Sequence, residues 1–153
     1  MDAVTYSNQR VIREVNNRTV PLRVHHKTEP LATEFNIRWT PTLIVLDGDG
    51  REHHRTVGYL PPEEFISWLL LGTAKSHFDR EELGPALELL DELLTKHSES
   101  DSAPEAIYLR GVSRYQLGED HSDLSAMREA YEQLDAKFPG NEWTKRATVY
   151  QRV

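Results

Sequence analysis

The first half of the chain contains two short extended runs separated by a polar turn. Residues 43–46 read Leu-Ile-Val-Leu, and a second run ends at Val57. Between them, residues 47–50 read Asp-Gly-Asp-Gly, and Asp-Gly steps between extended runs are typical of hairpin turns. The pattern predicts a β-hairpin that begins near Pro41, because proline has no N–H and is tolerated only at the start or edge of a strand.

Apolar patterns on both sides of the hairpin predict further elements. Helical spacing predicts a helix within residues 2–17, and alternation of apolar and polar residues predicts a strand over residues 19–25. A proline at position 30 favours a short helix over residues 31–36. Residues 61–71 predict a helix that covers the sheet.

Beyond Gly72 the apolar spacing is helical throughout. Four helices are expected: one with a capping-box-like start at Asp79 and Glu82, one opened by Pro104 and closed by Gly118, one over residues 124–138, and one around Trp143, Ala147 and Tyr150. The leucine stripe of the first of these helices should pack against the helix at residues 61–71.

The first two of these helices resemble the next two at an offset of about forty residues. Leu93 corresponds to Leu134, and Ala106 corresponds to Ala147. Helix pairs with small residues at their crossing resemble tetratricopeptide-type repeats. The sequence therefore predicts a helical, TPR-like second domain.

Charge divides the chain at the same place. Residues 1–75 carry 9 basic and 9 acidic residues, whereas residues 76–153 carry 9 and 16, so the net charge of −7 lies in the second half. This shift predicts two domains, residues 1–74 and residues 75–153, with a boundary near residues 72–77. Neither half has the basic stripe that phosphate binding needs, so we do not expect nucleic acid as a partner.

The residues around the hairpin carry a family resemblance. Residues 37–43 read Ile-Arg-Trp-Thr-Pro-Thr-Leu, the hairpin ends in Val-Gly-Tyr at 57–59, and a helix opens with Pro-Pro-Glu-Glu-Phe at 61–65. This order resembles the C-terminal part of a thioredoxin-like domain. In that family the proline at the position of Pro41 follows a cis bond and faces a catalytic Cys-x-x-C. The resemblance implies an α/β fold with a cis Thr40–Pro41 bond.

The resemblance starts at the end of the family's active-site helix and covers about half the chain. Met1 stands only a few residues past the position of the family's second cysteine, and the chain contains no cysteine. We therefore expect a truncated thioredoxin-like sheet that lacks the Cys-x-x-C segment and the central strand before it. Such a chain can form no disulfide, thiolate metal site or cysteine nucleophile.

The resemblance also implies a candidate peptide-binding surface, where the family holds extended peptides. Its residues here are Trp39, Thr40, Pro41, Gly58 and Tyr59. The family usually has a smaller residue at the position of Trp39. This side chain could fill the space of the missing segment or line a peptide groove. We expect no cofactor.

Three motifs suggest metal binding, but a simpler interpretation is favoured for each. The pairs His25-His26 and His53-His54 are adjacent on extended chain and should point to opposite faces, which gives at most one ligand per face. The Asp-Gly-Asp-Gly segment lacks the third acidic position and the closing Glu of a calcium loop. We expect surface histidines, an ordinary turn and no metal site.

These features predict a non-catalytic protein-binding or assembly module. The alternative is a thiol-disulfide oxidoreductase whose Cys-x-x-C lies upstream of the given start. The polar first residues are no signal peptide, and the longest strongly apolar stretch, residues 65–71, is far below the roughly 18 residues of a membrane span. We therefore expect a soluble cytoplasmic protein with no membrane contact.

A homodimer is expected as well as a protein or peptide partner. Loss of the central strand leaves unpaired backbone groups and apolar side chains in the middle of the sheet. Self-pairing through a strand edge, or exchange of residues 2–17, would cover them.

Overall fold

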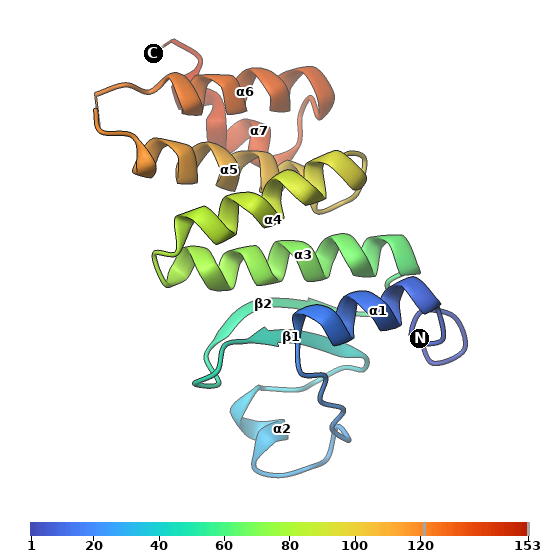
Figure 1. The fold of residues 1–153 in the computed structure, drawn as a ribbon. Helices are drawn as coiled ribbons and strands as arrows, with labels where there is room; N and C mark the ends of the chain where they lie inside the picture. The colour runs from blue at the N-terminus through green and yellow to red at the C-terminus, as the bar shows by residue number, and fades with distance from the viewer. Residues whose placement is uncertain (121, 153) are drawn as a thin grey trace.

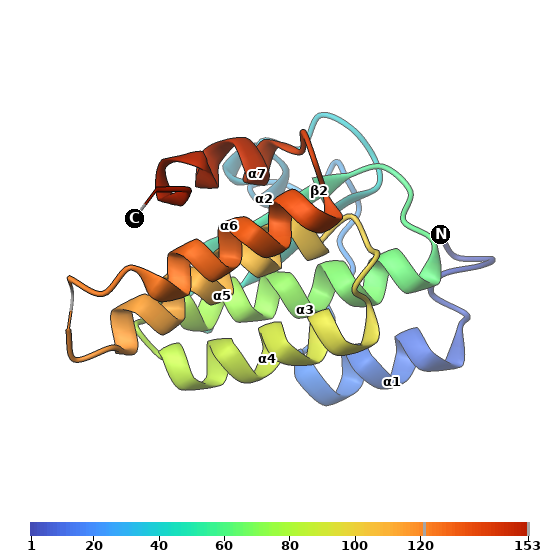
Figure 2. The same cartoon turned by 90° about the horizontal axis from the view of Figure 1, so that it is seen from above.

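The computed structural model describes residues 1–120 and 122–152 of the 153-residue chain. Its elements are α1 (Gln9–Arg18), α2 (Leu31–Glu34), β1 (Thr42–Leu46), β2 (Glu52–Val57), α3 (Pro62–Asp79), α4 (Leu83–Lys96), α5 (Ala103–Leu117), α6 (Ser125–Lys137), α7 (Glu142–Ala147) and a short 3₁₀ helix, Thr148–Tyr150. Figures 1 and 2 show the hairpin, α3, α4, α5 and α6 packed in succession, with α1 beside α3 and α7 against α5 and α6. The expected α/β class with a C-terminal helical segment is confirmed.

The helix α3 lies at the centre of this arrangement. Its first turn contains Pro62, which needs no N–H partner there, and Glu63 and Glu64, whose carboxylates favour a helix N-terminus. Its buried residues lie on all sides of the helix: Phe65, Ile66, Ser67, Trp68, Leu69, Leu70, Leu71, Gly72, Ala74 and Ser76. A helix buried all round needs cover on every side, and here the hairpin and α1 cover one side while α4 covers another.

The hairpin lies directly against the backbone of α3 at Gly72. A Cβ atom on Gly72 would be 2.7 Å from Val45 Cγ2 and 3.1 Å from His54 Cβ. These distances leave no room for a side chain. The absence of a side chain at Gly72 therefore sets how closely the sheet and the central helix approach.

The predicted hairpin is confirmed, but it contains a bulge that the sequence did not indicate. The strands pair antiparallel with Val45 opposite His54, and the next pair is Leu46 opposite Glu52. His53 is therefore the extra residue of a β-bulge. The turn is an ordinary one, in which the Asp47 side chain accepts hydrogen bonds from N–H groups within the turn.

The predicted strand over residues 19–25 is wrong. These residues leave α1 as an irregular segment, and Val20 and Leu22 are 95% and 80% exposed. A strand needs a neighbour that pairs with its backbone, and the sheet formed by the described residues consists of β1 and β2. The alternation of apolar and polar residues over 19–25 is typical of a strand, but no described strand lies beside this segment to pair with it.

The predicted helix within residues 2–17 is shorter than expected. It begins at Gln9, because the Asn8 side chain accepts hydrogen bonds from N–H groups of the first turn. The residues before it form turns rather than helix. Within them the fully buried Thr5 donates its hydroxyl to the Leu60 carbonyl at 2.6 Å, which ties the start of the chain to the end of the hairpin.

The helix predicted at residues 61–71 continues without a break to Asp79. The chain leaves the helix through Glu81, which has a left-handed backbone with φ of +62°, and the N–H of Glu82 bonds back to the His77 carbonyl. The capping-box interpretation of Asp79 is therefore wrong, because this residue closes α3 instead of opening α4. The predicted boundary at residues 72–77 falls inside α3, and the division into two domains stays a prediction.

The helical half packs against α3, as its leucine stripe predicts. Leu90 and Leu93 of α4 belong to the same core cluster as the buried residues of α3. That cluster also contains Val11 of α1 and Ala106 of α5. A single apolar core therefore joins the hairpin half of the chain to the first two helices of the other half.

The internal offset of about forty residues has a structural counterpart. Leu93 and Leu134 are both fully buried, and each accepts the N–H of the residue that ends its helix, at 2.7 and 2.8 Å. Ala106 and Ala147 are also fully buried. This equivalence fits two related helix pairs, while their assignment to tetratricopeptide-type repeats stays a prediction.

Replacement of Gly72 by alanine tests the close contact between hairpin and helix. Alanine favours a helix interior over glycine by up to about 1 kcal/mol, but here its methyl group would overlap Val45. We expect Gly72→Ala to lower the free energy of unfolding by about 1–3 kcal/mol, measured by urea denaturation. The control is Gly84→Ala in α4, where the added carbon would have no atom of another segment within 4 Å. Equal stabilisation by both changes would contradict the contact.

Candidate functional site

The candidate surface lies at the end of the hairpin opposite the Asp-Gly turn. The Thr40–Pro41 bond, which the sequence predicts to be cis, is cis. The Pro41 carbonyl accepts a hydrogen bond from the Gly58 N–H at 2.8 Å, so the two residues lie side by side where the strands begin and end. Gly58 has φ of +106°, a conformation that other residues rarely adopt.

Two aromatic side chains flank this pair. Trp39 is 70% exposed and Tyr59 is 54% exposed. The Thr42 hydroxyl donates to the Trp39 carbonyl at 2.6 Å and so fixes the backbone that carries the indole. The interpretation that Trp39 fills the space of a missing segment is wrong, because a filling side chain would be buried.

A shallow hollow of about 260 Å³ adjoins Trp39. It is lined by His26, Ile37, Arg38, Trp39 and Thr40. The first three of these residues were not predicted as part of the site. They come from two segments on either side of α2, and no local pattern in the sequence indicates that these segments meet.

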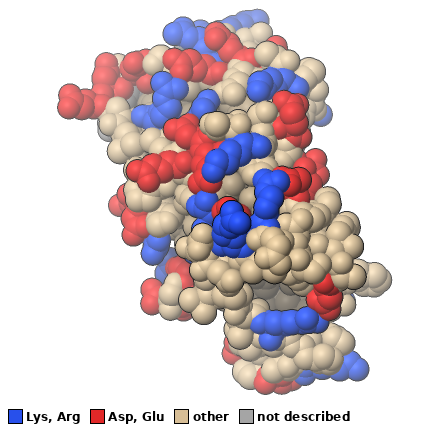
Figure 3. Space-filling view, turned by 45° about the vertical axis from the view of Figure 1, so that its right-hand side comes forward, with Lys and Arg blue, Asp and Glu red and all other residues tan. Residues whose placement is uncertain are grey.

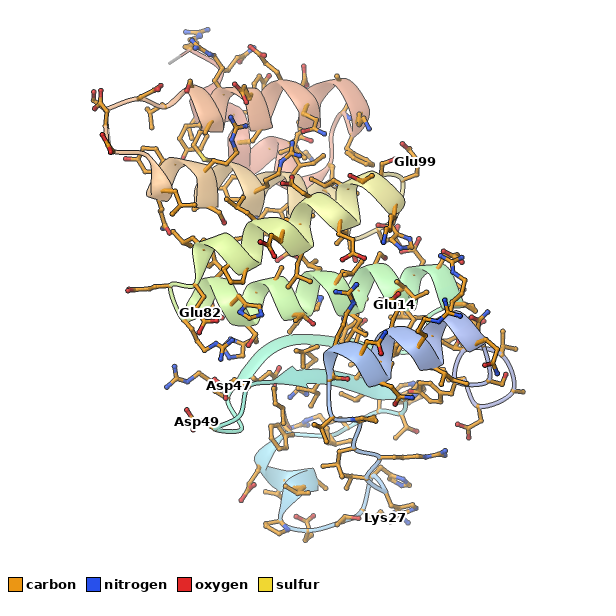
Figure 4. The ribbon with its side chains drawn as sticks, viewed as in Figure 1. Glu14, Lys27, Asp47, Asp49, Glu82 and Glu99 are labelled. Atoms are coloured by element: carbon orange, nitrogen blue, oxygen red, sulfur yellow. The ribbon has the colours of Figure 1, made fainter. Side chains whose placement is uncertain are left out.

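His53 lies between two carboxylates. Its Nδ1 is 2.6 Å from Asp79 Oδ2 at the end of α3, and its Nε2 is 3.0 Å from Asp47 Oδ2 in the turn. Burial lowers the pKa of His53, but the two hydrogen bonds raise it more, so the pKa lies above its ordinary value of 6.5. The bond from His53 is the main cause that lowers the pKa of Asp47 to about 2. Figure 4 labels Asp47 at the tip of the hairpin, below the turn between α3 and α4.

The neighbouring His54 has the opposite electrostatic environment. Its ring stacks on Trp68 with centroids 5.4 Å apart, and Lys75 Nζ lies 3.4 Å from its Nδ1. Burial, and after it the charge of Lys75, lowers the pKa of His54 to about 4. The pKa values of two adjacent histidines are therefore shifted in opposite directions, that of His53 upward and that of His54 downward.

The expectation that His53 and His54 are surface residues on opposite faces is wrong. The bulge at His53 turns both side chains toward α3, since one reaches Asp79 and the other Trp68. Both residues support the hairpin on the helix and lie away from the candidate surface. The other pair, His25 and His26, is exposed as expected, but its rings lie 4.4 Å apart, so the expectation of opposite faces is wrong for this pair as well.

Exposed apolar side chains gather in the hairpin half of the molecule. Among the described residues, Leu117 and Val149 are the large exposed apolar side chains of the helical half, and the others lie within residues 1–60. Figure 3 shows broad uncharged surface over the lower part of the molecule and a mixture of both charges over the helices above.

In the part of the chain that the structure describes, no group of three or more His, Asp or Glu side chains is arranged to hold a metal ion. No helix formed by the described residues is both long and apolar enough to cross a membrane.

Comparison with known families agrees with this geometry. A family model described as a thioredoxin-like domain matches residues 3–72, a range that contains the whole candidate surface. The match ends within α3, and helices α4 to α7 follow it. The expected thioredoxin-like region followed by a helical segment is confirmed. Neither curated proteins nor solved structures gave a match.

The His53 cluster predicts a defined dependence of stability on pH. Because the pKa of His53 is raised, its contribution is complete below about 6.5, the unfolded value, and is lost as the pH rises through the folded value. Asp47 contributes above about 3.9 and loses its contribution as the pH falls through about 2. We expect His53→Gln to cost about 1.5–3 kcal/mol between about pH 4 and 6.5, and less at higher pH.

Urea unfolding of the wild type and the variant across this pH range measures the difference. The comparison is needed because His54, with its lowered pKa, removes stability as the pH falls from 6.5 toward 4 and opposes His53 in the wild-type profile. The exposed His25 offers a control, His25→Gln, which should leave the profile unchanged. A cost of His53→Gln that grows with pH would contradict the charged cluster.

Proposed function

We propose that this chain, in which residues 3–72 form a thioredoxin-like domain followed by a helical segment, is a protein-binding or assembly module without thiol redox activity. Thiol–disulfide exchange requires an attacking thiolate, and the chain contains no cysteine to supply one. The domain can therefore use its surface for recognition but not for exchange chemistry of its own.

The observation that carries the proposal is the exposure of Trp39 and Tyr59 on either side of Pro41 and Gly58. Tryptophan and tyrosine are the side chains most often responsible for binding energy at protein interfaces, because they bury a large area at a small cost in conformational freedom. The Gly58–Pro41 hydrogen bond fixes the backbone close to both residues before a partner arrives, which lowers the cost of ordering this segment on binding.

The chemistry of the hollow indicates what such a partner carries. Arg38 is exposed there and donates its Nε–H to the Asn36 side chain at 2.9 Å, and it has no ion-pair partner among the described residues. A carboxylate of a bound peptide can pair with this guanidinium while an apolar side chain covers Trp39. The proposed partner is therefore a peptide segment with apolar and acidic residues.

We also propose that the chain associates with a second copy of itself. Val20 and Leu22 are almost fully exposed on the segment after α1, and a second copy of the chain provides cover for such apolar side chains. This surface differs from the aromatic pair at residues 39 and 59, so a dimer and a bound peptide are compatible.

Peptide selection tests the binding proposal. Short random peptides displayed on phage, selected against the full chain, should yield binders that contain apolar and acidic residues. We expect Trp39→Ala to weaken the selected peptides about tenfold or more, which is the loss of about 1.4 kcal/mol or more, measured by titration calorimetry. Val149→Ala is the matched control, because Val149 is 69% exposed but lies in the helical half.

Binding that is insensitive to Trp39→Ala and Tyr59→Ala would remove the candidate surface from the proposal. A second measurement addresses the redox alternative. If the chain accelerated the reduction of insulin by dithiothreitol above the blank rate, the absence of redox activity would be disproved.

Light scattering tests self-association. We expect a mass of about twice 17.7 kDa that falls to the monomer value on dilution. The double variant Val20→Asp and Leu22→Asp should be monomeric with unchanged circular dichroism, because neither side chain is part of a buried core. A wild-type mass near 17.7 kDa at every concentration would overturn this part of the proposal.

A further inference from the structure

We propose that the open edge of β1 receives one extended segment of the partner protein, which pairs with it as a third strand of the sheet. This inference rests on the proposed function that the chain binds proteins.

The hydrogen bonds at the two ends of β1 show which residues face β2. At one end the Gly58 N–H donates to the Pro41 carbonyl, and at the other the Asp47 N–H donates to the Arg51 carbonyl at 3.0 Å. Residues of an antiparallel strand alternate between facing their neighbour and facing away. The odd-numbered residues from 41 to 47 therefore face β2, and the bulge does not disturb this order because its extra residue is in β2.

The even-numbered residues present their backbone groups to the other edge. These are Thr42, Ile44 and Leu46, each with one N–H and one C=O. Within residues 1–120 and 122–152, no backbone hydrogen bond involves these groups. Figure 1 shows the chain from residue 19 to residue 41 on this side of β1, with no strand beside it. Three donors and three acceptors at a two-residue spacing match the backbone of an extended chain, whereas a helix has its own groups paired.

The face of the sheet determines the side chains that such a segment needs. Leu43 and Val45 point toward α3 and pack in its core. A third strand places its alternate residues next to these two on the same face, so apolar side chains are required there. The intervening residues point to the other face, where Leu46 is 39% exposed.

A positive charge near the start of β1 indicates which residue the partner segment carries at one end. Arg38 lies in the hollow beside Thr40, next to the start of β1. The occupant is therefore a segment of about five residues, the length of β1, with apolar residues at alternate positions and an acidic residue at one end.

Amide hydrogen exchange on the full chain, followed by NMR, tests the pairing. The probe is a synthetic peptide of alternating valine and threonine with a glutamate at one end. We expect the amides of Thr42, Ile44 and Leu46 to exchange fast in the free monomer and to slow at least tenfold when the peptide binds. The amides of Leu43 and Val45, which already face β2, are the internal control and should change little.

A matched pair of N-methylated peptides gives a second readout. One peptide carries methyl groups on every second amide, and the other carries them on the remaining amides. In strand pairing only one set of amides faces β1, so the two peptides should differ at least tenfold in affinity. Ile44→Pro in the protein should abolish binding yet fold, because proline is tolerated on an edge strand where the N–H faces away from the ladder.

The outcomes separate this inference from the proposed function. If peptides bind in a manner that depends on Trp39 while the three amides stay unprotected and both methylated peptides bind equally, strand pairing is overturned and the binding function stands. Protection of these amides in the free monomer would overturn the inference because the edge would be covered from within. Protection that appears only on dimerisation would assign the edge to a second copy. If neither this peptide nor any selected peptide binds, both proposals fail.

Discussion

Burial of α3 on all sides is the constraint on which the rest of the structure depends. A helix that is apolar all round cannot face water, so it must be covered both by the hairpin with α1 and by α4. The hairpin approaches the backbone of α3 very closely, because Gly72 has no side chain and leaves room for Val45 and His54. The position of β1, and with it the orientation of its open edge, follows from this contact.

Two kinds of interaction then hold the hairpin on the helix. Near Gly72 the contact is apolar and aromatic, with a neutral His54 stacked on Trp68. At the turn it consists of hydrogen bonds between His53 and the carboxylates of Asp47 and Asp79. Because the two histidines are adjacent, only the bulge between the strands lets both face the helix. At the opposite end of the hairpin, Trp39 and Tyr59 are exposed.

The sequence predicts elements that depend on local chemistry and misses features that depend on distant partners. The hairpin, the Asp-Gly turn and the helix opened by Pro104 follow from turn residues and apolar spacing, and all three are present. The strand at residues 19–25 has the right alternation but no neighbour, which no local pattern can reveal. The five candidate surface residues were named from the family resemblance. The hollow beside Trp39 and the His53 cluster were missed, because each joins residues from separate segments.

The continuity of α3 has a consequence for how parts of this chain can be recombined. The thioredoxin-like match ends at residue 72, yet the same helix continues to Asp79 and shares its core with α4 and α5. A cut at the end of the match would leave each piece with half of a helix whose buried face had lost its cover. Neither piece is therefore a portable unit. A chimaera that transfers the hairpin surface to another protein must carry α3 whole, together with a substitute for α4.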